Sequence, residues 1–152
     1  MNDRIKSWLF VITQAIILAL LIFLPGAQNA PQLMFLQLGR VFQISGVIIL
    51  LVSFYDLRKS LTALPLPKEN GALQINGLYK YVRHPMYVGV LVLMLGTTVS
   101  SGSMLKYLLV ITLYILFSYK ARYEEKLLLQ KYPGYKAYLH KTRRFMPTIS
   151  KF

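Results

Sequence analysis

Four stretches with almost no charge decide what this chain can fold into. The first covers residues 8–24, which are 17 residues without a charged side chain, and further apolar runs cover 41–55, 86–105 and 107–119. About 20 apolar residues in a helix are enough to cross a bilayer. A hydrophobic fraction of 55% with only 15% charged residues is too apolar for a soluble domain. We therefore expect an all-α integral membrane protein with about four transmembrane helices.

The length of 152 residues predicts a single membrane domain, 1–152. The expected segments are membrane helices at 8–25, 34–57, 86–104 and 105–120, a loop at 58–85 and a C-terminal region at 121–152. The last apolar run would be only about 20 Å long as a helix. The hairpin that it forms with the preceding run therefore either crosses the bilayer or dips into it. The first run could instead be the core of a cleavable signal peptide, because Arg4 and Lys6 precede it.

The fourth helix is expected to extend beyond the membrane. Good helix formers follow the last apolar run, and no helix breaker occurs before Pro133. After Pro133 and Gly134, residues 135–145 predict a short amphipathic basic helix with Tyr135 and Tyr138 on one side. That helix would lie on the membrane surface or cover the polar loop.

The charge distribution predicts the orientation. The net charge is +13, and 16 of the 18 Lys and Arg residues fall outside the apolar runs on one side, leaving Arg40 and Lys106 toward the other. The positive-inside rule then makes both termini and the loop cytoplasmic in a multi-pass protein. This rule accounts for the charge, so membrane lipids are expected partners and nucleic acid is not. Without cysteine there is no thiolate zinc site, and no metal is expected; the sequence predicts no oligomeric state.

The polar loop ends at a helix start that suits an anion. Pro85 fits the first helical turn, which places Arg83 and His84 directly before it. Free backbone N–H groups and an arginine fork favour a carboxylate there. Three turn signals predict an ordered loop of short pieces: Pro65-Leu66-Pro67, Glu69-Asn70-Gly71 and Asn76-Gly77.

Each candidate residue also has an ordinary structural explanation. Arg83 could be a membrane anchor, and His84 could be a hydrogen-bonding residue at a helix start. Glu124 and Glu125 could be surface ions, because Arg122 precedes Glu125 by three residues and such pairs contribute about 0.2 to 0.5 kcal/mol. Taken singly, none of these residues indicates an enzyme.

Their order and spacing carry a resemblance. The sequence GLYKYVRHPMYVG at 77–89, then EEKLL at 124–128, YPGYKAY at 132–138 and RRFMP at 143–147, resembles the isoprenylcysteine carboxyl methyltransferase and phospholipid methyltransferase superfamily. The resemblance covers residues 73–147. The chain is similar to small prokaryotic-type members, which implies the cell membrane of a bacterium or an archaeon.

The resemblance implies an integral membrane enzyme that uses S-adenosylmethionine, held at the cytosolic end of the last two helices. It implies catalytic roles for Arg83, His84 and Glu125. It implies a cofactor pocket lined by Arg83, His84, Pro85, Tyr87, Gly89, Glu124, Glu125 and Leu128.

The chemistry of these residues agrees with that ligand. Arg83 suits the cofactor's carboxylate, and a glutamate suits its ribose hydroxyls or ammonium. Successive helix positions point about 100° apart, so Glu124 and Glu125 cannot face one ligand equally; we favour Glu125 for direct contact. An aromatic face for the adenine or the sulfonium is expected from Tyr79, Tyr87 or Tyr123.

The expected acceptor is a small amphiphile or lipid that enters from the bilayer. A carboxylate is favoured because no proton must be removed from it, whereas an amine would need a base such as His84. Gly89-Val90-Leu91 lacks the second glycine of the phospholipid branch, and the chain lacks the additional spans of eukaryotic carboxyl methyltransferases. Two alternatives to a methyltransferase stay open: the chain could be an NADPH-dependent membrane reductase related to the sterol reductases, or a noncatalytic membrane partner protein.

Overall fold

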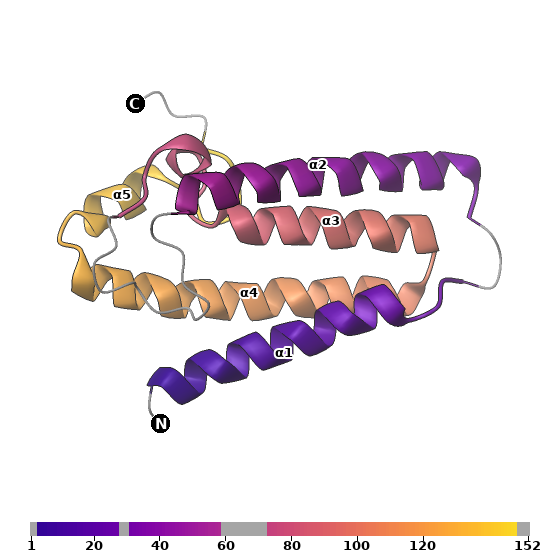
Figure 1. Ribbon diagram of the computed structural model, residues 1–152, viewed down its shortest axis with the longest axis horizontal. Helices are drawn as coiled ribbons and strands as arrows, with labels where there is room; N and C mark the ends of the chain where they lie inside the picture. Colours follow the sequence, from indigo (N-terminus) through magenta and orange to yellow (C-terminus); the bar gives the residue numbers. More distant parts are fainter. Residues whose placement is uncertain (1–2, 28–30, 59–72, 149–152) are drawn as a thin grey trace.

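The computed structural model describes residues 3–27, 31–58 and 73–148. Within these ranges the chain forms five α-helices, one short 3₁₀ helix and no strand, which confirms the all-α prediction. The elements are α1 (Asp3–Phe23), α2 (Leu33–Leu57), η1 (Gly77–Lys80), α3 (Pro85–Ser101), α4 (Met104–Lys131) and α5 (Tyr135–Lys141). Figure 1 shows α1 to α4 as an elongated bundle, with η1 and α5 at the end where α1 begins. We call this end, which holds Asp3, η1 and α5, the polar end.

Helix lengths agree with a membrane protein of about four spans. Three helices, α1, α2 and α4, are long and apolar enough to cross a membrane. The short helix is α3 rather than α4, because α3 has 17 residues, or about 25 Å. The predicted continuation of the fourth helix past residue 120 is confirmed, since α4 runs without a break to Lys131. Any mismatch with the bilayer thickness therefore falls on α3.

Small residues let α2 and α3 pack backbone against backbone. Gly39, Gly46 and Ser53 recur every seven residues along α2, and all three are buried. A Cβ on Gly46 would lie 2.5 Å from the backbone nitrogen of Leu93, and one on Gly96 would lie 2.6 Å from the carbonyl oxygen of Gly39. Both distances are below contact range, so a side chain there would force the helices apart. The seven-residue glycine spacing was a signal that the sequence analysis did not use.

The other side of the bundle is packed by larger side chains. Ile17 and Leu21 of α1 meet Leu113 and Phe117 of α4 in the buried core, together with Met94 of α3. The turn between α3 and α4 has two residues and lies before the expected helix boundary at 104–105. It consists of a left-handed glycine, Gly102, with φ of 63°, and the following serine.

The expected loop and the C-terminal helix are found in part. The Asn76-Gly77 turn is confirmed by the positive φ of Gly77, 64°, while the other two turn signals lie outside the described residues. The C-terminal helix ends earlier than expected, at Lys141. Tyr135 and Tyr138 are buried beneath it, and the Tyr138 hydroxyl donates a hydrogen bond to the carbonyl oxygen of Tyr79 at 2.5 Å. Helix α5 therefore covers the segment that leads into α3.

Candidate active site

The segment leading into α3 is anchored to the end of α2. The Asp56 carboxylate accepts a hydrogen bond from the N–H of Leu78 at 2.9 Å. Gly77 lies against the same carboxylate, and a Cβ at this position would overlap it. Glycine is needed here both for the positive φ and for the space. This contact fixes where η1 begins.

The C-terminal tail holds the same segment from the other side. The backbone N–H groups of Arg83 and His84 donate to the carbonyl oxygens of Arg143 and Arg144, at 3.0 and 3.2 Å. Helix α3 then starts at Pro85, which is buried and stands in the first turn, as predicted. Two segments about 60 residues apart are thus joined directly before a helix start.

Glu125 is the centre of a buried ion cluster. Its carboxylate accepts hydrogen bonds from Arg83 Nε at 2.9 Å and from Arg144 Nη2 at 2.5 Å, and it lies 3.2 Å from His84 Nε2. Burial alone would raise the pKa of Glu125, but the bonds from His84 and Arg144 and the charge of Arg83 hold this pKa well below its ordinary value. The Glu125 carboxylate is therefore ionised, and both of its oxygens accept hydrogen bonds from groups of the protein.

Glu124 points to a different part of the cluster. Its carboxylate accepts a hydrogen bond from the Tyr87 hydroxyl at 2.5 Å and lies 3.4 Å from His84 Nδ1. Its side chain is 19% exposed, against 7% for Glu125. The preference for Glu125 as the direct ligand stays a prediction, but Glu124 is the carboxylate with more free surface.

His84 lies between the two glutamates. Its ring stacks on Tyr87, with centroids 5.4 Å apart and planes 2° from parallel. Burial lowers the pKa of His84, but hydrogen bonds to Glu124 and Glu125 and their charges outweigh it and raise the pKa above the ordinary value. The protonated ring can then donate from both nitrogens.

The Arg83 guanidinium binds groups of the protein itself. Besides Glu125, it donates through Nη1 to the carbonyl oxygens of Leu139 and Thr142. The Arg83 fork was predicted to bind a carboxylate of a ligand, whereas in the structure it is paired with the carboxylate of Glu125. Next to it, Thr142 Oγ1 is buried without a hydrogen-bond partner among the described residues. The sequence analysis did not name Thr142.

The other predicted residues lie at different distances from this cluster. Tyr79 is buried under α5, and Leu128 is half-buried one turn beyond Glu125. A Cβ on Gly89 would meet Leu50 of α2 at 2.8 Å, so Gly89 serves helix packing. Tyr123 turns toward α1, where its hydroxyl donates to the Asp3 carbonyl oxygen at 3.2 Å.

Two cationic residues of this region were not predicted: Arg144, which belongs to the cluster, and Lys120, which lies beside it. Arg144 stands in the RRFMP segment that carries the resemblance, but no role was assigned to it. Lys120 is buried, and its Nζ donates to Gln14 Oε1 of α1 at 2.7 Å and lies 5.2 Å from the Tyr87 ring centroid. That it follows the core residues Leu113 and Phe117 on the same helix is visible only in the fold.

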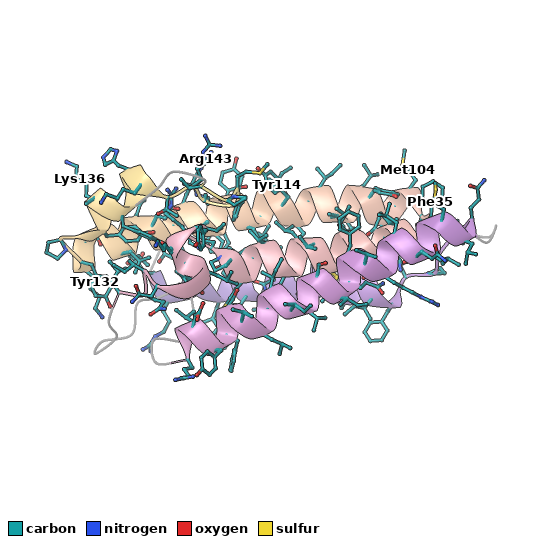
Figure 2. All side chains as sticks on the ribbon, turned by 90° about the horizontal axis from the view of Figure 1, so that it is seen from above. Phe35, Met104, Tyr114, Tyr132, Lys136 and Arg143 are labelled. Carbon is teal, nitrogen blue, oxygen red and sulfur yellow. The ribbon has the colours of Figure 1, made fainter. Side chains whose placement is uncertain are left out.

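An apolar groove leads toward the cluster. It has a volume of about 270 Å³ and lies between α3 and α4, lined by Leu91, Val92, Leu95, Val110, Ile111 and Tyr114. The Tyr114 ring contacts Phe145 at 5.7 Å, and Phe145 lies 6.2 Å from the His84 ring. Figure 2 shows Tyr114 on α4, close to where the C-terminal segment with Arg143 crosses the helix. Tyr114 and Phe145 therefore connect this groove to the His84 ring of the ion cluster.

Comparisons with known proteins agree with the resemblance. No curated protein matches the chain. The family model of the phospholipid methyltransferases matches residues 34–134, about two thirds of the chain, including α2, α3 and α4. Because this match covers more than half of the chain, the chain belongs to the phospholipid methyltransferase family.

Proposed function

We propose that this membrane methyltransferase uses S-adenosylmethionine and acts on a small amphiphilic or lipid-like acceptor, with a carboxylate favoured, at the cytoplasmic membrane face. One observation carries the proposal: the rings of Tyr114 and Phe145 connect an apolar groove between α3 and α4 to the His84 ring of the ion cluster. A polar reaction site that adjoins an apolar groove suits an acceptor with an apolar chain and a polar head.

The polar groups near Arg83 fit the cofactor. S-adenosylmethionine supplies a methyl group on a sulfonium, whose leaving group is already activated. Glu124, with its larger exposed surface, suits the ribose hydroxyls or the ammonium. The unpartnered hydroxyl of Thr142 offers one further hydrogen bond. The chain's residues then need to align the reactants and exclude water rather than supply a strong base.

The state of His84 supports a carboxylate acceptor. An amine must lose a proton before it can attack, so it requires a base. His84 has a raised pKa and two acidic partners, which favour the protonated ring. A protonated histidine cannot take the proton of an amine, whereas a carboxylate needs no proton removed.

The orientation belongs to the same proposal. Most Lys and Arg residues flank the polar end, which the positive-inside rule places in the cytoplasm. Figure 2 shows Lys136 and Met104 at opposite ends of the molecule. In this Cys-free chain, Met104→Cys should be labelled from outside intact cells and Lys136→Cys should not. Labelling of Lys136→Cys from outside would contradict this orientation and indicate the opposite one.

Cofactor binding tests the function directly. S-adenosylmethionine and NADPH are titrated in parallel into the purified protein, and only the first should bind. Glu124→Gln removes a charge-assisted contact and should weaken S-adenosylmethionine binding about tenfold or more. The matched control is Lys126→Gln, an exposed residue of the same helix, which should bind normally. Binding of NADPH alone, or equal affinity in both variants, would contradict the proposal.

A further inference from the structure

Lys120 is a buried cation with a neutral partner. Its residue surface is 6% exposed, and Nζ donates a 2.7 Å hydrogen bond to the side-chain oxygen of Gln14. Glu124, one turn further along α4, acts on it through space, but among the described residues no ion pair joins Lys120 to a carboxylate. A buried charge held only by a neutral group costs free energy that an anion would offset.

The charges around Lys120 do not balance. The two glutamates of the cluster are already engaged: Glu125 by Arg83, His84 and Arg144, and Glu124 by His84 and Tyr87. With His84 protonated, this region holds four cations and two anions. The cations are Arg83, His84, Arg144 and Lys120, and the anions are Glu124 and Glu125. This part of the protein therefore favours a ligand that brings negative charge.

The position of Lys120 connects the first helix to the reaction site. Nζ lies 5.2 Å from the ring centroid of Tyr87, and the other neighbours of that ring are His84, stacked at 5.4 Å, and Phe117, stacked at 4.5 Å. Gln14 belongs to α1, which lies outside the region matched by the family model. The pair thus joins α1, which lies outside the matched region, to α4 and the Tyr87 ring within it.

We propose that Lys120 and Gln14 form a subsite for the anionic head of an acidic amphiphile. The inference rests on the proposed function, and it assigns to α1 a role in choosing the acceptor. The cation of Lys120 holds the carboxylate, and the Gln14 amide, which now accepts from Lys120, turns to donate its N–H to the same group. The alternative explanation is that the pair merely ties α1 to α4.

Gln14→Glu separates the two explanations because it gives Lys120 a permanent anionic partner of the same size. If the pair is only a tie, this change strengthens it and leaves acceptor binding intact. If the pair is a subsite, the new carboxylate occupies Lys120 and repels an acidic acceptor. Lys120→Met removes the cation altogether, and Lys126→Met on the exposed side of α4 is the matched control.

Binding is measured first without the cofactor, as the thermal stabilisation of the protein in nanodiscs by dodecanoate compared with dodecanol. A ligand that binds the folded state raises the unfolding temperature. Dodecanoate should stabilise the wild type and Lys126→Met more than dodecanol does. This difference should vanish in Gln14→Glu and in Lys120→Met. A wild type without the difference, or a Gln14→Glu variant that keeps it, would overturn the subsite.

Methyl transfer is measured second, with saturating S-adenosylmethionine. In Gln14→Glu the KM for dodecanoate should rise about ten- to a hundredfold, the expected effect of losing a charge-assisted contact, while the Kd for S-adenosylmethionine is unchanged. An unchanged KM for dodecanoate, or an equal weakening of S-adenosylmethionine binding, would overturn the subsite. If the wild type binds no S-adenosylmethionine but keeps the dodecanoate difference, the proposed function fails and the anion subsite stands.

Discussion

The contact between α2 and α3 and the ion cluster at the polar end stabilise the bundle by opposite means. Along α2 and α3, side chains are absent where the backbones meet, so Gly46 and Gly96 permit contacts that a Cβ would block. At the polar end, long charged side chains from three segments meet at Glu125. The first region is fixed by shape, and the second is fixed by charge.

This difference matches what each region must do. Close backbone packing has two discrete states, together or apart, and makes a rigid scaffold for the start of α3. In an ion cluster, a charged group can exchange a partner in the protein for a ligand atom, because the ligand atom replaces the hydrogen bond that is lost. A site that binds and releases a charged ligand is therefore expected in the second region.

The largest effect is expected at the centre of the cluster. Glu125→Gln removes the charge that offsets Arg83 and Arg144, which leaves two arginines partly or fully buried without an anion. Breaking a buried pair in this way costs about 3 to 5 kcal/mol. Thermal unfolding in detergent should show a large loss of stability. A variant as stable as the wild type would mean that the cluster is not buried in the membrane protein.

Arg83→Ala should come next. Arg83 was expected to bind the cofactor's carboxylate, but it also donates to the Leu139 and Thr142 carbonyl oxygens. Its removal should cost about 1.5 to 3 kcal/mol of stability as well.

Arg83→Lys keeps the charge but lacks the planar fork, so it should recover only part of both properties. The measurements are the unfolding temperature and the Kd for S-adenosylmethionine. An Arg83→Ala variant with wild-type stability would return this residue to a role in binding alone.

How far the sequence predicted these two regions depends on the range of the interactions. Helices, the extension of α4 and the place of Pro85 follow from local hydropathy and helix signals, and they were predicted. Arg83, His84 and Glu125 were named because they stand in a recognisable order. That Arg83 is paired with Glu125 depends on contacts 42 residues apart, which hydropathy does not encode.

The missed residues have the same physical explanation. Arg144 and Lys120 look like ordinary basic residues of a basic tail, and only the fold shows that one meets Glu125 and the other meets Gln14. Gly89 was assigned to the cofactor by its place in the motif. Its contact with Leu50 reflects a helix pairing that its own segment does not reveal.

The glycine contact should give a moderate effect. Gly46→Ala puts a Cβ within 3 Å of backbone atoms of Leu93, so α2 and α3 must separate slightly. Overpacking of this kind costs about 1 to 3 kcal/mol. Gly134→Ala is the control, because nothing lies within 4 Å of a Cβ there. Unfolding temperatures should fall for the first and not for the second, and equal values would show that the helices do not touch at Gly46.

The smallest effect is a pH dependence that originates in the cluster. The pKa of His84 is raised in the folded protein, so its protonation stabilises the fold most fully below the unfolded pKa of about 6.5. This contribution is lost as the pH rises through the folded pKa, and each unit of difference corresponds to about 1.4 kcal/mol. His84→Gln should therefore flatten the fall in unfolding temperature above pH of about 6.5. His140→Gln, which changes the exposed histidine of α5, should keep the wild-type slope. If the two variants show the same slope, the imidazolium of His84 does not contribute to the stability of the cluster, and the two glutamates are held by the arginines and Tyr87 alone.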